Sequence, residues 1–215
     1  MLRRSTWISL VRRRSELRSD SKTPNSENLD VKLECASHHE AGHIVIAAVQ
    51  GLKLRAEGLI VDALGEGLAC YFKEPEENDL SRERVAVASF AGFKAEKRLR
   101  QEHSYARLHE LGITLSPDWV HARKSISKLS PKYPLGDREM IRIRLESVSE
   151  RLVEENWVTI QALAAAVLAR DLMPLQPPKS LTQWSDETMA RYLAGEELVG
   201  ILRECGITAV CGAAD

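Results

Sequence analysis

Residues 38–43 read His-His-Glu-Ala-Gly-His, and an apolar Ile-Val-Ile run follows directly. The last five of these six residues match the pattern H-E-x-x-H. Residues four apart lie on the same face of an α-helix, so His39 and His43 can direct their imidazoles at one zinc ion. Glu40 follows His39 in the chain, and its carboxylate can reach a water molecule held by that ion. The stretch therefore predicts a helix that carries a zinc site with a catalytic base.

The pattern is rare enough to be informative. With 6 histidines in 215 residues, random placement would give H-E-x-x-H about 0.02 times in such a chain. Apolar residues recur at helical spacing over residues 33–52, as a buried active-site helix requires. The alternative interpretation is a surface helix with a few polar residues. His38 lies off the face that the two histidines share, so it is not assigned to the metal.

Two histidines leave a zinc site incomplete. A catalytic site normally has three protein ligands and keeps the fourth position for water. The downstream candidates for the third ligand are Glu96, His103, His109, Asp118 and His121. Spacing alone does not choose among them, although a carboxylate on a second helix, Glu96 or Asp118, suits the chemistry best.

The remaining periodicity predicts an α+β domain that is mostly helical. Two short apolar runs, at residues 58–62 and 68–72, flank a glycine-rich turn and indicate a β-hairpin. The Ser116-Pro117 pair is typical of a helix start, with serine as N-cap and proline in the first turn. Further helices are expected at residues 81–100, at 137–169 in one or two pieces, and at 186–194 after Ser185. The later helices are predicted to form a C-terminal helical bundle beside the hairpin.

Composition excludes several classes of protein. The chain carries 30 basic and 31 acidic residues, and this net charge of -1 argues against nucleic acid as the main partner, because phosphate binding needs a basic excess. No apolar run approaches the roughly 20 residues that cross a bilayer, so no integral membrane segment is predicted. The 4 cysteines form no C-x-x-C pair and indicate reduced thiols in a cytoplasmic protein.

The order of the motifs resembles the peptidase domain of FtsH-type zinc metalloproteases. HEAGH at 39–43 precedes a hydrophobic run and a hairpin, then Ala-Gly-Phe-Lys-Ala-Glu at 91–96, then Ser-Pro-Asp-Trp-Val-His-Ala at 116–122. In that family HEAGH supplies two ligands and the base, an A-G-x-x-A-E helix packs against it, and an Asp at the start of a later helix is the third ligand. The likeness covers about residues 33–195.

Carried over residue by residue, the resemblance implies a zinc ion on His39, His43 and Asp118. It implies Glu40 as the catalytic base and Glu96 as a carboxylate that supports a ligand or the helix packing. The expected reaction is hydrolysis of a peptide bond, in which Glu40 takes a proton from the zinc-held water and returns it to the leaving amine.

Other side chains have two interpretations each. His121, three residues after Asp118, is an alternative ligand, a donor that supports one, or a plain surface histidine. The tryptophan Trp119 is expected to anchor helix packing, and the charged face of residues 138–155 to be solvated. The edge of the hairpin could pair with an extended peptide across the zinc, or simply cover the motif helix.

The predicted function is that of an ATP-independent zinc metalloendopeptidase. The family's best-known members carry a membrane anchor and an ATP-driven ring, whereas this chain resembles the stand-alone members. Its substrate is then a peptide, a flexible or unfolded protein segment, or a protein delivered by a partner, and the family's ring assemblies imply homo-oligomers. The competing predictions are a non-catalytic, zinc-bound adaptor on a peptidase fold, and a hydrolase of small amides.

The chain is predicted to form one domain with irregular ends. Residues 1–21 hold six Arg and two acidic residues without apolar periodicity. The predicted division is a disordered basic N-terminal arm at 1–30, a zinc peptidase core at 31–130, a C-terminal helical part of the same domain at 131–195, and a tail at 196–215.

Overall fold

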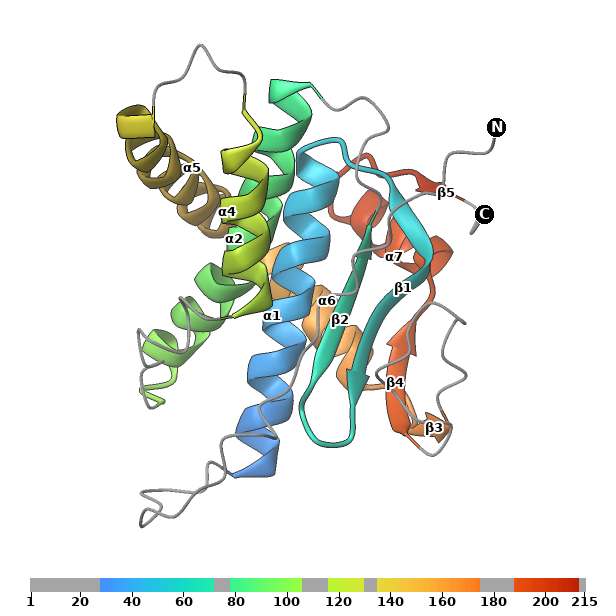
Figure 1. The fold of residues 1–215 in the computed structure, drawn as a ribbon. Coiled ribbons are helices and arrows are strands. Elements are labelled where there is room, and N and C mark those ends of the chain that lie inside the picture. The colour runs from blue at the N-terminus through green and yellow to red at the C-terminus, as the bar shows by residue number, and fades with distance from the viewer. Residues whose placement is uncertain (1–27, 72–77, 106–115, 130–134, 175–187, 213–215) are drawn as a thin grey trace.

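The computed structural model describes residues 28–71, 78–105, 116–129, 135–174 and 188–212. These residues form an α+β fold that is mostly helical, as predicted (Figure 1). The helices are α1 (Leu29–Val49), α2 (Asp79–Glu102), α4 (Pro117–Ser127), α5 (Leu135–Glu155), α6 (Trp157–Leu168) and α7 (Gly195–Glu204). The strands are β1 (Leu54–Asp62), β2 (Gly67–Tyr71), β3 (Met173–Pro174), β4 (Met189–Leu193) and β5 (Cys211–Gly212).

Helix α1 lies at the centre of the molecule, between α2 on one side and the strands β1 and β2 on the other (Figure 1). The side chain of Asn28 caps its first turn by accepting a hydrogen bond from the amide of Asp30. The chain leaves the helix at Gly51, whose φ of +75° is a conformation that glycine adopts without strain. Residues 39–43 therefore lie in the second half of α1, in the middle of the fold.

The predicted hairpin is confirmed, although its first strand begins earlier than expected. Strands β1 and β2 pair antiparallel, with Ile60 opposite Leu68 and Val61 opposite Gly67. The sheet order is β2-β1-β4-β3, and β5 joins the start of β1 as a parallel neighbour. Strand β2 is therefore at one edge of the sheet, next to α1.

Small side chains let α1 and α2 approach closely. A Cβ atom on Gly42 would lie 2.8 Å from Cβ of Ala95 and 2.9 Å from the carbonyl oxygen of Ala91. These distances are shorter than real Cβ contacts, so glycine is needed at this position. The close approach brings the backbone of α2 next to the motif residues of α1.

The start of α4 and the break within the long helical region also agree with the sequence. The hydroxyl oxygen of Ser116 accepts a hydrogen bond from the amide of Trp119, and Pro117 occupies the first turn. Helices α5 and α6 are two pieces that meet at Asn156. One hydrophobic core joins residues from all six described helices and from β1 and β4.

Two predictions for the C-terminal region are wrong. Residues 189–193 form strand β4 rather than a helix, because they pair with β1, with Leu193 opposite Leu59. Most of the predicted tail at 196–215 is ordered as α7 and β5. Helix α7 buries Leu198 and Leu202 in the core, and the carboxylate of Glu197 accepts a hydrogen bond from the amide of Ala194 at its start.

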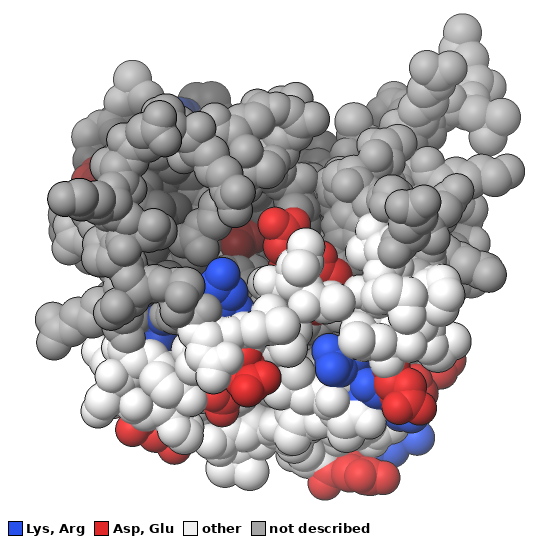
Figure 2. Space-filling model, turned by 90° about the horizontal axis from the view of Figure 1, so that it is seen from below, with Lys and Arg blue, Asp and Glu red and all other residues white. Residues whose placement is uncertain are grey.

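The surface of the described residues carries both charges. On the face shown in Figure 2, Lys and Arg side chains are interspersed with Asp and Glu side chains. None of the described helices combines the length and the apolar character that a bilayer crossing requires. Residues 1–27 of the basic arm, His109 and Ser185 lie outside the described residues.

Candidate metal centre

Three predicted ligands from two helices converge in the structure. His39 and His43 come from α1 and Asp118 from the first turn of α4, and each offers one ligand atom within 4.8 Å of the others. Oδ2 of Asp118 lies 3.0 Å from Nε2 of His39 and 3.5 Å from Nε2 of His43. Ligand atoms around a tetrahedral zinc ion lie about 3.3 Å apart, as bond lengths near 2.05 Å require. The two distances to Asp118 are close to this value, whereas the group as a whole spans up to 4.8 Å and would have to contract to share one ion.

The far nitrogen of each imidazole is held by a hydrogen bond. Nδ1 of His43 donates to the carbonyl oxygen of Ala88 at 2.7 Å, and Nδ1 of His39 donates to Oε2 of Glu96 at 3.1 Å. A carbonyl oxygen can only accept, so the contact with Ala88 places a proton on Nδ1 of His43. The Nε2 atom of each ring faces Asp118, and a metal ion bound there would take the place of the protons on these nitrogens.

Glu96 contacts His39 on the nitrogen that faces away from Asp118. Its second carboxylate oxygen, Oε1, accepts from Nε of Arg100 at 2.9 Å and lies 2.8 Å from Nη2 of the same side chain. Burial opposes ionisation of Glu96, but the hydrogen bond from His39 and the charge of Arg100 hold its pKa below the ordinary value. Of the two carboxylates that the sequence left open as third ligand, Asp118 is the one near both Nε2 atoms.

The electrostatics of the cluster favour positive charge. Burial opposes the charged form of His39, yet its hydrogen bonds to Asp118 and Glu96 hold its pKa well above the usual range. Burial likewise disfavours the Asp118 carboxylate, yet the two histidines hold its pKa well below the usual range. A place where imidazoles gain protons and a buried carboxylate stays ionised is one that a cation can occupy in their stead.

Gly92 of α2 leaves the space that an ion would need. A Cβ atom on this glycine would lie 2.4 Å from Nε2 of His43 and 2.5 Å from Nε2 of His39. Zinc–nitrogen bonds are about 2.0–2.1 Å long, so such a Cβ would stand close to the position of an ion shared by the two rings. The donor set, the contacts of the two Nδ1 atoms and the lack of a side chain at Gly92 are compatible with a zinc ion.

Glu40 lies beside the centre, under strand β2. Glu40 is 9% exposed, and its side chain packs against Gly67, where a Cβ would lie 2.4 Å from Cγ of Glu40. Burial raises the pKa of Glu40, partly offset by the two histidines and by a hydrogen bond from the backbone of Ala69. Glu40 is thus a buried carboxylate, fixed in direction, with more affinity for a proton than an exposed glutamate.

The other histidines in the described residues are not part of this cluster. His121 is on α4, but it contributes no atom to the group of potential ligands. His103 follows the end of α2, where its ring stacks on Tyr105 at 5.4 Å between centroids. Nδ1 of His38 donates to the carbonyl oxygen of Glu34 at 2.9 Å, on the side of α1 that faces Trp157.

Sequence reasoning missed three residues that shape the site. Gly67 leaves room for the Glu40 side chain, Gly92 leaves room beside Nε2 of His39 and His43, and the ring of Phe93 meets His39 edge-on at 4.8 Å. The sequence pattern predicts only a glycine-rich turn around Gly67, and the resemblance implies only a helix that packs against the motif helix around Gly92. Arg100, one turn after Glu96, carried the one usable signal, because an i,i+4 carboxylate–guanidinium pair can be recognised in a helical sequence.

Metal analysis tests this centre directly. The wild-type protein, reloaded and desalted, is expected to hold one zinc per chain. His43→Ala and Asp118→Ala are each expected to hold less than about one-tenth of that, because each removes a ligand. His103→Ala is the matched control and is expected to keep its zinc. Full zinc in Asp118→Ala would remove Asp118 from the centre.

Comparison with known proteins identifies no family. The chain matches no protein-family model and no curated protein. The resemblance to FtsH-type peptidases therefore remains an inference from the HEAGH, A-G-x-x-A-E and S-P-D segments and their order.

Proposed function

We propose that the chain is a zinc metallopeptidase that hydrolyses peptide bonds in peptides or in unfolded protein segments. The observation that carries this proposal is the convergence of His39, His43 and Asp118 beside the buried carboxylate of Glu40. A structural zinc site is closed by four protein ligands, whereas the described residues offer three here. An adaptor with a structural zinc would also have no use for the base.

Each residue has a definite task in this proposal. His39, His43 and Asp118 would hold a zinc ion, which would supply a water molecule with a pKa near 7 and a Lewis acid for the substrate carbonyl. Glu40 would act as the general base and then return a proton to the amine nitrogen that leaves. Glu96 and the carbonyl oxygen of Ala88 keep the imidazoles turned toward Asp118.

The position of β2 favours an extended peptide as substrate. In the described sheet this strand pairs with β1 alone, so its other edge faces away from the sheet. The amide of Ala69 on this strand contacts Glu40. A peptide that adds to β2 by main-chain hydrogen bonds would pass directly by the base. Small amides would gain nothing from this edge, which supports peptides over them.

The arrangement of the elements also supports an FtsH-type assignment. The HEAGH residues are on α1, the hairpin follows, Gly92 and Glu96 are on α2, and Asp118 is at the start of α4. Every role that the resemblance implies for these residues is compatible with their positions. We propose that the chain acts without ATP, on substrates that are already unfolded.

Cleavage of an unfolded protein tests the proposed function. Zinc-loaded wild type is expected to degrade reduced casein. Treatment with 1,10-phenanthroline is expected to lower the cleavage rate at least about 100-fold, and equimolar zinc to restore it. A protein with one zinc per chain that cleaves neither casein nor a peptide library would instead be an adaptor. Hydrolysis of small amides without peptide cleavage would instead indicate a small-amide hydrolase.

A further inference from the structure

The position of Asp118 depends on what holds a short helix in place. Asp118 lies in the first turn of α4, which has 11 residues and buries Asp118, Ala122 and Ile126. Isolated helices of this length are marginal in water, so α4 owes its place to its neighbours. The distance from Asp118 to the two histidines is therefore set by contacts outside the ligands themselves.

Trp119, the next residue after Asp118, makes contacts with two other helices. Its indole meets the ring of Phe90 on α2 edge-on, at 5.3 Å between centroids and 67° between planes. The guanidinium carbon of Arg142 on α5 lies 5.3 Å from the centre of the same indole. Aromatic pairs and cation–π contacts of this geometry are both attractive. The indole is thus held between α2 and α5.

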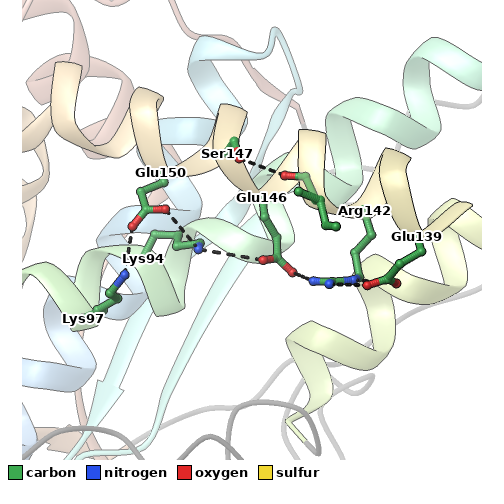
Figure 3. A network of polar contacts seen from close by, with 8 residues as sticks. Lys94, Lys97, Glu139, Arg142, Glu146, Ser147 and Glu150 are labelled. Carbon is green, nitrogen blue, oxygen red and sulfur yellow. Dashed lines mark hydrogen bonds and ion pairs between the residues drawn. The ribbon is translucent and has the colours of Figure 1, made fainter. Parts of the chain in front are cut away.

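Arg142 is itself fixed by carboxylates on both sides. Its Nε donates to Oε2 of Glu139 at 2.9 Å, and its Nη1 donates to Glu146, as Figure 3 shows. Glu146 also lies 4.0 Å from Nζ of Lys94 on α2. The guanidinium cannot leave the indole without giving up two ion pairs. The charged face of α5, predicted to be solvated, therefore makes specific contacts in this part.

The same network joins α5 to the helix that borders the metal centre. Nζ of Lys94 lies 3.4 Å from Glu150, and Nζ of Lys97 lies 3.0 Å from the same carboxylate (Figure 3). Lys94 is two residues after Gly92, on the α2 segment next to the histidines. Helix α5 therefore contacts both α2, through the lysine–glutamate ion pairs, and the first turn of α4, through Trp119.

We infer that Arg142 is a positioning residue for the metal ligand Asp118, acting through the indole of Trp119. Arg142 holds the indole of Trp119 against the ring of Phe90. This contact keeps the first turn of α4, and with it Asp118, close to His39 and His43. The inference rests on the proposed metal site. Arg142 is not one of the potential metal ligands, so its effect on zinc would be indirect. Its removal is expected to weaken zinc binding because Asp118 would be held less firmly.

The zinc dissociation constant tests this role, measured by competition with a chromophoric chelator. Arg142→Ala is expected to weaken zinc binding about 10-fold, the lower end of the effect of residues that orient ligands. Arg142→Lys is expected to recover part of this loss, because it keeps the charge but not the planar fork. Arg151→Ala is the matched control on the same helix, where Arg151 pairs with Glu155 at 2.9 Å; its affinity is expected to match wild type.

Two further readouts separate positioning from general stability. The thermal midpoints of the metal-free Arg142→Ala and Arg151→Ala proteins are expected to agree within about 3 °C, because partly exposed ion pairs contribute little to folding. The visible spectrum of bound Co²⁺ is expected to change in Arg142→Ala only. Wild-type zinc affinity in Arg142→Ala would overturn the inference, whereas a wild-type protein that binds no zinc would overturn the proposed function instead.

Discussion

Gly92→Ala is expected to abolish zinc binding while the protein stays folded. The new Cβ would lie 2.4 Å from Nε2 of His43, 2.5 Å from Nε2 of His39 and 2.6 Å from Cδ2 of His39. An ion at bonding distance from both nitrogens would need the same space. To avoid these short contacts, the imidazoles would have to turn away from the new Cβ. This movement would break their hydrogen bonds to Glu96 and Ala88. We expect zinc to fall from one per chain to less than about one-tenth.

The substitution is otherwise a mild one, so the loss can be attributed to the site. Gly92 is inside helix α2, where alanine is favoured over glycine by about 1 kcal/mol. Gly200→Ala is the matched control, because Gly200 is also helical and a Cβ there meets no atom within 4 Å. It is expected to keep one zinc per chain and to raise the unfolding temperature slightly. A Gly92→Ala protein that binds zinc with wild-type affinity would place the ion elsewhere.

Local signals predicted the elements that carry the site. The spacing of His39 and His43 needs only a helix, and the Ser116-Pro117 pair marks the start of α4 through its own chemistry. The third ligand could not be chosen this way, because Asp118 is 79 residues from His39 and only tertiary packing brings them together. Glu96 and Asp118 approach opposite nitrogens of the same imidazole, a distinction that no spacing rule contains.

The errors of prediction for β4 and α5 have a common cause in long-range contacts. The residues of β4 form a strand because β1, more than a hundred positions earlier, offers its edge to them. In isolation their short apolar pattern fits a helix equally well. Helix α7 was missed for a different reason: the glycines and alanines near the end of the chain suggested a loose tail, although Leu198 and Leu202 have helical spacing. The role of α5 depends on Trp119, a contact that the pattern of charges on one helix does not reveal.

Glu40→Gln is expected to keep one zinc per chain and to lose casein cleavage by about 100- to 10,000-fold, the usual contribution of a general base. The amide has the shape of the carboxylate, so it still fits beneath Gly67 and its oxygen still accepts from the backbone of Ala69. It cannot accept a proton at neutral pH, and this is the property that the reaction needs. The zinc ligands are unchanged, so metal content and catalysis should separate in this variant.

The measurement is kcat/KM on an internally quenched peptide, together with zinc per chain, for wild type and variant. Glu155→Gln makes the same chemical change at a carboxylate that is 49% exposed on α5 and should cleave at the wild-type rate. A loss of zinc in Glu40→Gln would mean that the carboxylate helps to hold the ion. Cleavage at the wild-type rate with zinc in place would show that Glu40 is not the general base. A glutamine amide cannot accept a proton at neutral pH, so another group would then have to do so.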